Sequence, residues 1–412
     1  MRNAHTTSRF ERAVVAAAVL GLTMVTAARP QQVARPFGSS YIQHHPEIEA
    51  IAAAKTAAGR QALALGVHST PPQTTTGTYV TFDVSGASTG FLQGTTPVGI
   101  NNAGVITGYY ADSNSLLHGF VRTSDGAITT FDAPGDANGT HPVGINDAGT
   151  VAGRYCDASL CHGFVRTADG TINTFDVPGA AGGTYPNGIG PQGAVTGYYW
   201  DAQYYAFAFV RAADGHFTKF QMAGAANGTD AINISRGGMA GMYVDATYTA
   251  HGFFGTDGVM TSFDPPGSLG VSALPYSFGT GLAVNAAGTV AGYYFESISG
   301  NPFGGNYRGF LRTPDGNFTT FDAGSEATCC LWTFTYDVNS SGVAIGSYND
   351  DTNSNYGFIR ATDGTITVLD APGAGLDNPF MGTAPQSIND HGEVAGYYMD
   401  TNFAVHGFIY RP

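Results

Sequence analysis

Residues 98–135 read VGINNAGVITGYYADSNSLLHGFVRTSDGAITTFDAPG, and residues 143–179 repeat the pattern as VGINDAGTVAGRYCDASLCHGFVRTADGTINTFDVPG. Four short segments rich in β-branched and aromatic residues alternate with Asn/Asp/Gly turns, which are typical of antiparallel hairpins. The segments are 98–101 (strand A), 105–111 (strand B), 118–123 (strand C) and 127–132 (strand D). The stretch therefore predicts one four-stranded antiparallel sheet.

The same unit recurs along the chain. Its Gly-x-Tyr element, in strand B, occurs seven times, at Gly108, Gly153, Gly197, Gly241, Gly292, Gly346 and Gly396. The Asn that ends strand A recurs after 45 residues (Asn101 to Asn146), and later after 54 and 50 (Asn285, Asn339 and Asn389). A period of about 40–55 residues with four strands per unit is typical of a β-propeller. We attribute the strand-B glycine to close approach of neighbouring sheets near the axis.

The seventh copy ends at Tyr410 without a strand D. The missing segment matches residues 78–84, which resemble residues 128–133. An N-terminal strand in this place would close the ring and remove a free sheet edge. The predicted fold is therefore all-β: a seven-bladed β-propeller of four-stranded antiparallel blades, closed by an N-terminal strand that completes the last blade. A solenoid, which needs neither a closed ring nor an N-terminal strand to complete its last unit, is the alternative.

Before the repeats, the chain changes character twice. Arg2, Arg9 and Arg12 precede an apolar run over 13–28 that ends in small residues. The run is shorter than the ~20 residues of a membrane span and is typical of a signal peptide. An uncleaved signal anchor is the rival interpretation.

The predicted organisation is accordingly a signal peptide over 1–28, an N-terminal segment over 29–77 and the propeller over 78–412. The middle segment is predicted to hold a helix over 46–66 and a linker over 67–77. We expect the mature protein to be secreted, periplasmic or on the cell surface, with no membrane association after cleavage.

Composition narrows the function classes. Charged residues make up 12% of the chain, about half the usual share. The formal net charge of −14 argues against nucleic acid as a partner, because phosphate recognition needs a basic surface. The sequence has no nucleophile elbow, phosphate loop, dinucleotide fingerprint or common metal-binding spacing. We expect no cofactor, no metal and a monomeric protein.

The Ile-Asn-x-x-Gly, Gly-x-Tyr, His-Gly-Phe and Asp-Gly elements resemble the HAF-type repeats of bacterial extracellular proteins. The resemblance covers residues 78–412 and rests on seven copies of short motifs in the same order. It implies an extracellular propeller-like repeat protein and carries no defined activity. Copy three departs from the pattern with Gly190, Phe207 and Gln221 in place of Asn, His and Asp, and copy four is irregular around 232–234.

The four cysteines fall into two pairs. Cys156 and Cys161 flank a predicted hairpin loop, and a disulfide between them is expected in an oxidising compartment. Cys329 and Cys330 are adjacent. The sequence is compatible both with a strained disulfide between these adjacent residues and with two free thiols.

Polar residues recur where the B–C and D–A connections share one end of the sheets. Acids follow strand B: Asp112, Asp157, Asp201, Asp245, Glu296, Asp350 and Asp400. Histidines open strand C: His118, His162, His251 and His406. Aspartates end strand D: Asp83, Asp132, Asp176, Asp264, Asp322 and Asp370. Such a ring could hold a cation or a polar ligand. We favour a structural role, with Asp capping turns and His bonding within or between blades, because functional sites break symmetry.

Excess length breaks the symmetry at this same end, in four neighbouring loops (265–281, 295–307, 323–335 and 371–386). They carry the aromatics Tyr276, Phe278, Phe303, Tyr307, Trp332, Phe334 and Phe380. Loops on a rigid scaffold often carry function, although simple drift in loop length is the alternative. The predicted ligand-binding residues are Tyr276, Glu296, Phe303, Tyr307, Arg308, Trp332 and Asp350.

These observations favour a secreted, non-enzymatic binding or scaffolding propeller whose ligand is a glycan, a peptide or another extracellular protein. No catalytic residues are assigned. The alternative is a glycan-active lyase or hydrolase that uses Asp, Glu or His on the same face. That alternative needs two carboxylates about 5–10 Å apart around one sugar.

Overall fold

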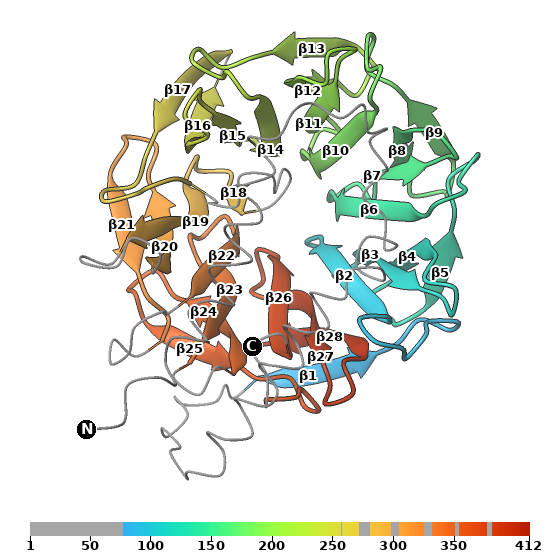
Figure 1. Ribbon diagram of the computed structural model, residues 1–412. Helices are drawn as coiled ribbons and strands as arrows, with labels where there is room; N and C mark the ends of the chain where they lie inside the picture. The colour runs from blue at the N-terminus through green and yellow to red at the C-terminus, as the bar shows by residue number, and fades with distance from the viewer. Residues whose placement is uncertain are drawn as a thin grey trace, which may run out of the picture.

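A computed structural model describes residues 77–256, 258–271, 281–297, 305–324, 332–350, 354–376 and 381–412. The predicted signal peptide and the predicted helix lie outside these ranges, as does the linker up to residue 76. Regular structure in the described ranges consists of 28 strands. None of the described segments forms a helix long and apolar enough to cross a membrane. Figure 1 shows the strands grouped in sheets that stand around a common centre.

Five sheets are separate and four-stranded, and each follows the chain order A, B, C, D. Sheet one has β2 (Thr95–Ile100), β3 (Ile106–Ala111), β4 (Leu117–Arg122) and β5 (Ile128–Phe131). Sheet two has β6 (Thr140–Ile145), β7 (Val151–Cys156), β8 (Cys161–Arg166) and β9 (Ile172–Phe175). Sheet three has β10 (Thr184–Ile189), β11 (Val195–Trp200), β12 (Ala206–Arg211) and β13 (Phe217–Phe220). Sheet four has β14 (Thr229–Ser235), β15 (Gly238–Val244), β16 (Ala250–Thr256) and β17 (Val259–Phe263). Sheet five has β18 (Leu282–Val284), β19 (Val290–Ser297), β20 (Gly305–Arg312) and β21 (Phe318–Phe321).

The sixth sheet has eight strands in two halves. Half 6a contains β22 (Thr333–Val338), β23 (Ala344–Asn349), β24 (Asn355–Arg360) and β25 (Ile366–Leu369). Half 6b contains β26 (Gly382–Ile388), β27 (Val394–Met399), β28 (Val405–Arg411) and β1 (Thr78–Phe82). One parallel residue pair, Asn355 with Gly382, joins the halves. The prediction of an all-β chain of four-stranded antiparallel sheets is confirmed, whereas a count of seven separate sheets is not met because this pair merges the last two.

The N-terminal strand pairs with the C-terminal strand. β1 runs antiparallel to β28 over five positions, from Thr78 opposite Arg411 to Phe82 opposite Gly407. This is the pairing predicted from the sequence. In Figure 1 the blue β1 lies along the outer side of the red strands β27 and β28.

A glycine–phenylalanine contact recurs between strands C and D, and β1 reproduces it. In sheet one, a Cβ added at Gly119 would lie 2.6 Å from the Phe131 ring, so the ring rests directly on the glycine. In half 6b, a Cβ at Gly407 would lie 2.9 Å from the Phe82 ring. Phe82 therefore occupies the place that Phe131 occupies in sheet one.

A cation–π contact between neighbouring sheets recurs in the same way. The Arg166 guanidinium of sheet two lies 5.0 Å from the centre of the Phe131 ring of sheet one. The Arg122 guanidinium of sheet one lies 4.9 Å from the Phe82 ring. Such contacts typically contribute about 0.5–2 kcal/mol. β1 thus packs on sheet one as β5 packs on sheet two.

The strand-B glycines are required by contacts within their own sheet. A Cβ at Gly153 would lie 2.5 Å from the Phe164 ring and 2.6 Å from the His141 carbonyl oxygen. Both residues belong to sheet two, so our attribution of these glycines to close approach of neighbouring sheets is wrong. The register of β6 against β7 shifts between Pro142 and Gly144, and such irregularities bend a strand locally.

A belt of buried asparagines links neighbouring sheets. The Asn101 Oδ1 atom accepts N–H groups of its own turn from Ala103 (3.1 Å) and Val105 (2.9 Å). Its Nδ2 atom donates to the Asn146 carbonyl oxygen of the next sheet at 3.1 Å. Asn389 donates likewise to the Asn101 carbonyl oxygen at 3.1 Å, across the join between half 6b and sheet one. The repeated Asn is therefore a satisfied core residue that holds both its turn and its neighbour.

The belt departs from this pattern in sheets three and four. Gly190 stands at the Asn position of sheet three and has no side chain to donate. Ser235 stands there in sheet four, and its hydroxyl donates to the Asn285 carbonyl oxygen at 2.7 Å. The departures in copies three and four of the sequence thus mark the place where the belt lacks an asparagine side chain, and at Gly190 it lacks a side-chain hydrogen bond to the next sheet.

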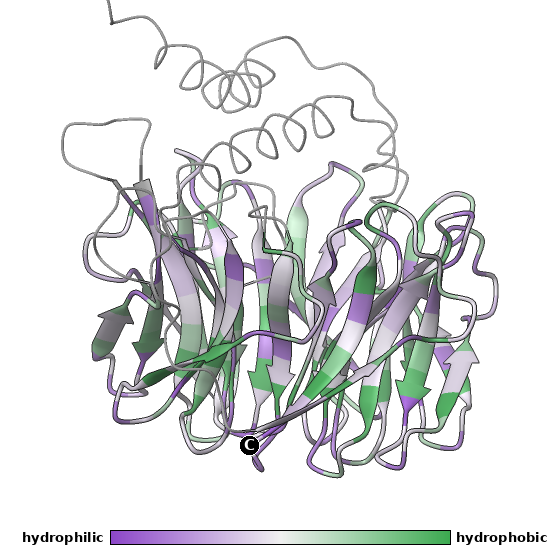
Figure 2. Ribbon diagram, turned by 90° about the horizontal axis from the view of Figure 1, so that it is seen from below, coloured by the Kyte–Doolittle hydropathy of each residue, from purple (hydrophilic) through white to green (hydrophobic). Residues whose placement is uncertain are grey.

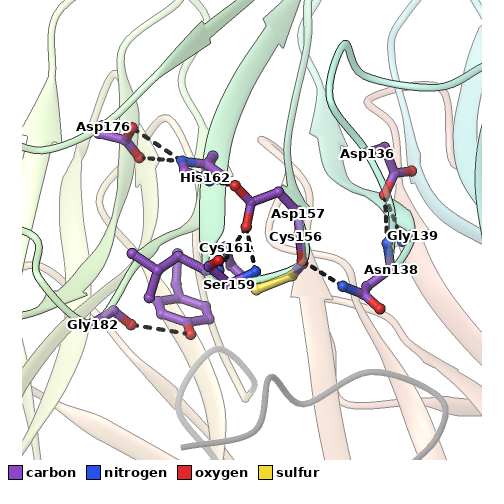
Figure 3. Close-up of a disulfide and its surroundings, with 12 residues drawn as sticks. Asp136, Asn138, Gly139, Cys156, Asp157, Ser159, Cys161, His162, Asp176 and Gly182 are labelled. Carbon is purple, nitrogen blue, oxygen red and sulfur yellow. Dashed lines mark hydrogen bonds and ion pairs between the residues drawn. A yellow bond between two sulfur atoms is a disulfide. The ribbon is translucent and has the colours of Figure 1, made fainter.

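A disulfide joins Cys156, at the end of β7, to Cys161, at the start of β8. The two residues are ladder partners and both are buried. Figure 3 shows the sulfur–sulfur bond beneath the B–C loop of sheet two. Cys329 and Cys330 lie outside the described residues.

Candidate functional site

The connections gather at two opposite ends of the sheets, as Figure 2 shows. The end that carries the C-terminus holds the A–B and C–D turns, and we call it the turn face. The other end holds the B–C and D–A connections, and we call it the loop face. The repeated acids and histidines belong to the loop face.

Each loop-face histidine binds two aspartates. In sheet two the His162 Nδ1 atom lies 2.9 Å from Asp176 Oδ1, and its Nε2 atom lies 3.3 Å from Asp157 Oδ2 (Figure 3). The His162 ring stacks on Tyr155, with 5.1 Å between ring centres. The Nδ1 contact recurs in His118–Asp132 (2.8 Å), His251–Asp264 (2.9 Å) and His406–Asp83 (2.9 Å). The histidine therefore fastens strands B, C and D together, and Asp83 of the N-terminal segment supplies the strand-D partner in half 6b.

The acid after strand B caps its own loop. The Asp245 Oδ1 atom accepts the N–H groups of Thr247 (2.8 Å) and Thr249 (2.9 Å). The Thr249 N–H and the Thr247 hydroxyl lower the pKa of Asp245 to about 2. No cluster of His, Cys, Asp or Glu in the described ranges has the arrangement of a metal site. These contacts support the structural role of the repeated acids and histidines.

Sheet five replaces the histidine with Arg308. Its guanidinium binds Asp322 through two nitrogens, at 2.8 and 3.2 Å, and lies 3.3 Å from Glu296 Oε2. Glu296 and Arg308, both predicted ligand contacts, thus bind each other. The Glu296 and Asp322 carboxylates share one guanidinium, which leaves neither available as an unpaired acid–base group.

Half 6a replaces the histidine with Tyr356. Burial, followed by the charges of Asp350 and Asp370, raises the pKa of Tyr356 to about 12. Asp350, another predicted ligand contact, accepts the Ser354 N–H at 2.9 Å and caps its loop as its counterparts do.

Two predicted residues meet at an aromatic cluster between sheet five and half 6a. The rings of Tyr307 and Trp332 lie 6.1 Å apart, and their backbones form an isolated parallel bridge. The Tyr307 ring centre lies 5.1 Å from that of Phe334 and 5.3 Å from that of Phe295. The ring centres of Tyr293 and Phe334 are 5.0 Å apart. We call these five residues the seam cluster. Burial raises the pKa of Tyr307.

The predicted residues do not form one surface. Tyr307 and Arg308 are consecutive in β20, and successive strand residues point to opposite faces of a sheet. The Tyr307–Trp332 pair and the Glu296–Arg308 pair therefore lie on opposite sides of sheet five. Tyr276 and Phe303, with Phe278, Phe380 and the central parts of the four long loops, lie outside the described residues.

The most exposed aromatic rings of the described residues were not predicted from the sequence. Tyr204, Tyr205, Tyr248 and Phe91 are 59%, 50%, 47% and 46% exposed, and all four lie in loop-face connections. Leu269 and Leu376 are also exposed on this face, whereas Val259 is the exposed large hydrophobic residue of the turn face within the described ranges.

Tyr204 and Tyr248 share a strained loop position with the half-buried Phe403 and with Ser115. Tyr204, Tyr248 and Phe403 have φ angles of 60°, 63° and 64°, a left-handed conformation that costs about 1–2 kcal/mol for a residue with a side chain. Each is the fourth residue of a B–C loop that opens with the capping aspartate. An aromatic residue at that recurring loop position was the available sequence signal.

Comparisons with known proteins bear on the fold alone. No protein-family model and no curated protein matches the chain. A catalytically inactive variant of virginiamycin B lyase from Staphylococcus aureus, crystallised with quinupristin, is 15% identical with a TM-score of 0.51 over 81% of this chain and 99% of that one. A streptogramin B lyase (12% identity, TM-score 0.49, 81% and 97% covered) and the Aleuria aurantia lectin (12%, 0.36, 80% and 93%) are more distant. The chain therefore has a propeller-like all-β fold.

Proposed function

We propose that the chain is an exported, seven-bladed β-propeller that binds a glycan on its loop face without transforming it. A count of seven blades is supported by the halves 6a and 6b, which share a single residue pair. Each half also has its own belt asparagine, Asn339 and Asn389, and its own set of four strands. The HAF-like repeats fit this architecture.

Export is supported by the apolar run over 13–28 and by the Cys156–Cys161 disulfide. Disulfides persist mainly in oxidising compartments outside the cytosol.

The observation that carries the binding proposal is the set of exposed aromatic rings on one end of the molecule. Tyr204 and Tyr248 have left-handed backbone and are 59% and 47% exposed, so their rings contribute little to the core. Strained conformations are retained where surrounding structure holds them, often at ligand sites. The rings stand on loops of neighbouring sheets, which suits a glycan chain that crosses both sheets and stacks sugars on them through their C–H faces.

The described carboxylates favour binding over catalysis. Glu296 and Asp322 share Arg308, and the other loop-face acids named above bind histidines or cap turns, except Asp370, whose pKa is raised by burial. A glycan-active enzyme would need an acid and a base free of such partners.

A glycan array followed by calorimetric titration of the glycans that bind tests the proposal. The Tyr204→Ala/Tyr248→Ala double variant should weaken binding roughly 30-fold or more, because loss of a well-placed aromatic contact typically costs about 2 kcal/mol. The matched control is Val259→Ala, whose side chain is 71% exposed on the turn face and whose loss should leave affinity unchanged. Binding that falls equally in both folded variants, or an array without any bound glycan, would contradict the proposal. Trp332→Ala tests separately whether the seam cluster contributes.

A further inference from the structure

A cavity of about 470 Å³ lies on the axis, on the loop-face side of the asparagine belt. Strand A of every sheet contributes to its wall, together with strand-B residues such as Tyr109, Arg154 and Tyr397. This volume suits a small molecule of monosaccharide size.

The residues of this wall differ from one sheet to the next. At one level of the sheets, the facing residues of strands A and B are Thr96 and Tyr109 in sheet one, but His141 and Arg154 in sheet two. Residues that only hold a ring of repeats together recur in most units, as the belt asparagines do outside sheets three and four. Unlike residues at this level therefore point to a role other than ring stability.

Arg154 differs from most of the other described arginines in its partners. Five of them stack on phenylalanine rings, and the same five donate to a neighbouring carbonyl oxygen, as Arg166 does to Thr167. Arg308 and Arg411 bind carboxylates. Arg154 makes no hydrogen bond or ion pair with any other described residue, and it lines the cavity. Arg154 is half-buried and forms no ion pair with a described carboxylate, so a ligand anion can supply its direct counter-charge.

His141 stands directly opposite Arg154 in the ladder of β6 and β7. Its Nδ1 atom is buried and has no hydrogen-bond partner among the described residues. Its ring lies on Tyr109, with 4.3 Å between ring centres. Burial, and then the charge of Arg154, hold the pKa of His141 well below its ordinary value, so the imidazole is neutral and Arg154 is the local cation.

We propose that Arg154 and His141 bind the carboxylate of a small organic acid inside this cavity. A guanidinium presents two parallel N–H donors that match the two oxygens of a carboxylate. A carboxylate carries one negative charge, which one guanidinium balances. A phosphate dianion would bring a second charge toward the acids around the cavity, Asp337 in its wall and the buried Asp230, which accepts Asn187 Nδ2 at 2.6 Å.

Binding of D-glucuronate to the full chain, followed by calorimetry, tests this site, with inorganic phosphate and D-glucose as comparison probes. We expect glucuronate to bind at least tenfold more tightly than either probe, and Arg154→Met to weaken its binding at least tenfold. The matched control is Arg236→Met, because Arg236 lines the adjoining axial cavity at the turn face and not the cavity that Arg154 lines. It should leave glucuronate affinity unchanged.

Several results would overturn the site: no glucuronate binding, equal binding by Arg154→Met, or phosphate binding as tightly as glucuronate. If Arg154→Met does not fold, Arg154→Lys keeps the charge without the paired donors and should also weaken binding, and unchanged affinity there overturns the proposal. A glucuronate-dependent shift of the His141 imidazole resonances in the unaltered protein gives a further readout, and its absence counts against the site. The Tyr204→Ala/Tyr248→Ala variant should bind glucuronate normally, so failure of the glycan proposal remains distinguishable.

Discussion

Removing residues 1–86 is expected to lower the melting temperature by roughly 10 °C or more, whereas removing residues 1–77 should change it by less than about 2 °C. The longer deletion takes away β1, whose five ladder positions cover the edge of β28. It also removes Phe82, which rests on Gly407 and lies beneath Arg122, and Val84, which is 2% exposed. Burial of such side chains typically contributes about 1.5–3 kcal/mol each.

Thermal unfolding of the two truncated proteins measures this difference, and the 1–77 deletion is the control for loss of the N-terminal segment as such. The bare β28 edge should also make the longer deletion prone to association through strand pairing. Equal melting temperatures would contradict closure by β1.

Gly153→Ala is expected to destabilise the protein by about 3 kcal/mol or to prevent folding, because overpacking against backbone cannot relax by a rotamer change. The new Cβ would lie 2.6 Å from the His141 carbonyl oxygen and 2.5 Å from the Phe164 ring.

Gly144→Ala in the same sheet is the matched control. Gly144 does not have the left-handed backbone, and its Cβ would meet Ile189 at 3.5 Å, an ordinary contact. Its effect should stay below about 1 kcal/mol. Urea unfolding of both variants measures the free energies, and similar losses would refute the packing role assigned to the strand-B glycine.

The sheets and their order could be predicted because each repeat contains the same short sequence motifs. Strand, turn and capping residues recur in the same order, and the N-terminal match at 78–84 needs no knowledge of three-dimensional contacts. The cause of the strand-B glycine could not be obtained this way. It depends on how closely the His141 carbonyl oxygen and the Phe164 ring approach Gly153, which the motif does not reveal.

The candidate site was less accessible to sequence reasoning. Consecutive residues of a strand alternate sides, so the strand pattern by itself is enough to place Tyr307 and Arg308 on opposite faces. The predicted site was chosen from the long loops, and Tyr204 and Tyr248 were missed because they lie in loops of ordinary length. Arg154 occupies the variable position of a Gly-x-Tyr motif, so the motif gives no reason to single it out. The proposal for Arg154 rests on the axial cavity, whose wall contains residues from all the sheets.

A disulfide engineered between β1 and β28 tests closure of the ring most directly. Val80 and Ile409 are ladder partners and pack in the same core cluster, so the Val80→Cys/Ile409→Cys variant should form a bond under oxidation. Peptide mapping by mass spectrometry of the monomer should find residues 80 and 409 linked within one chain, and should not find the shifted pair of Val80→Cys/Tyr410→Cys linked. Absence of the 80–409 link, or a link formed between two chains, would contradict a ring closed by its own N-terminal strand.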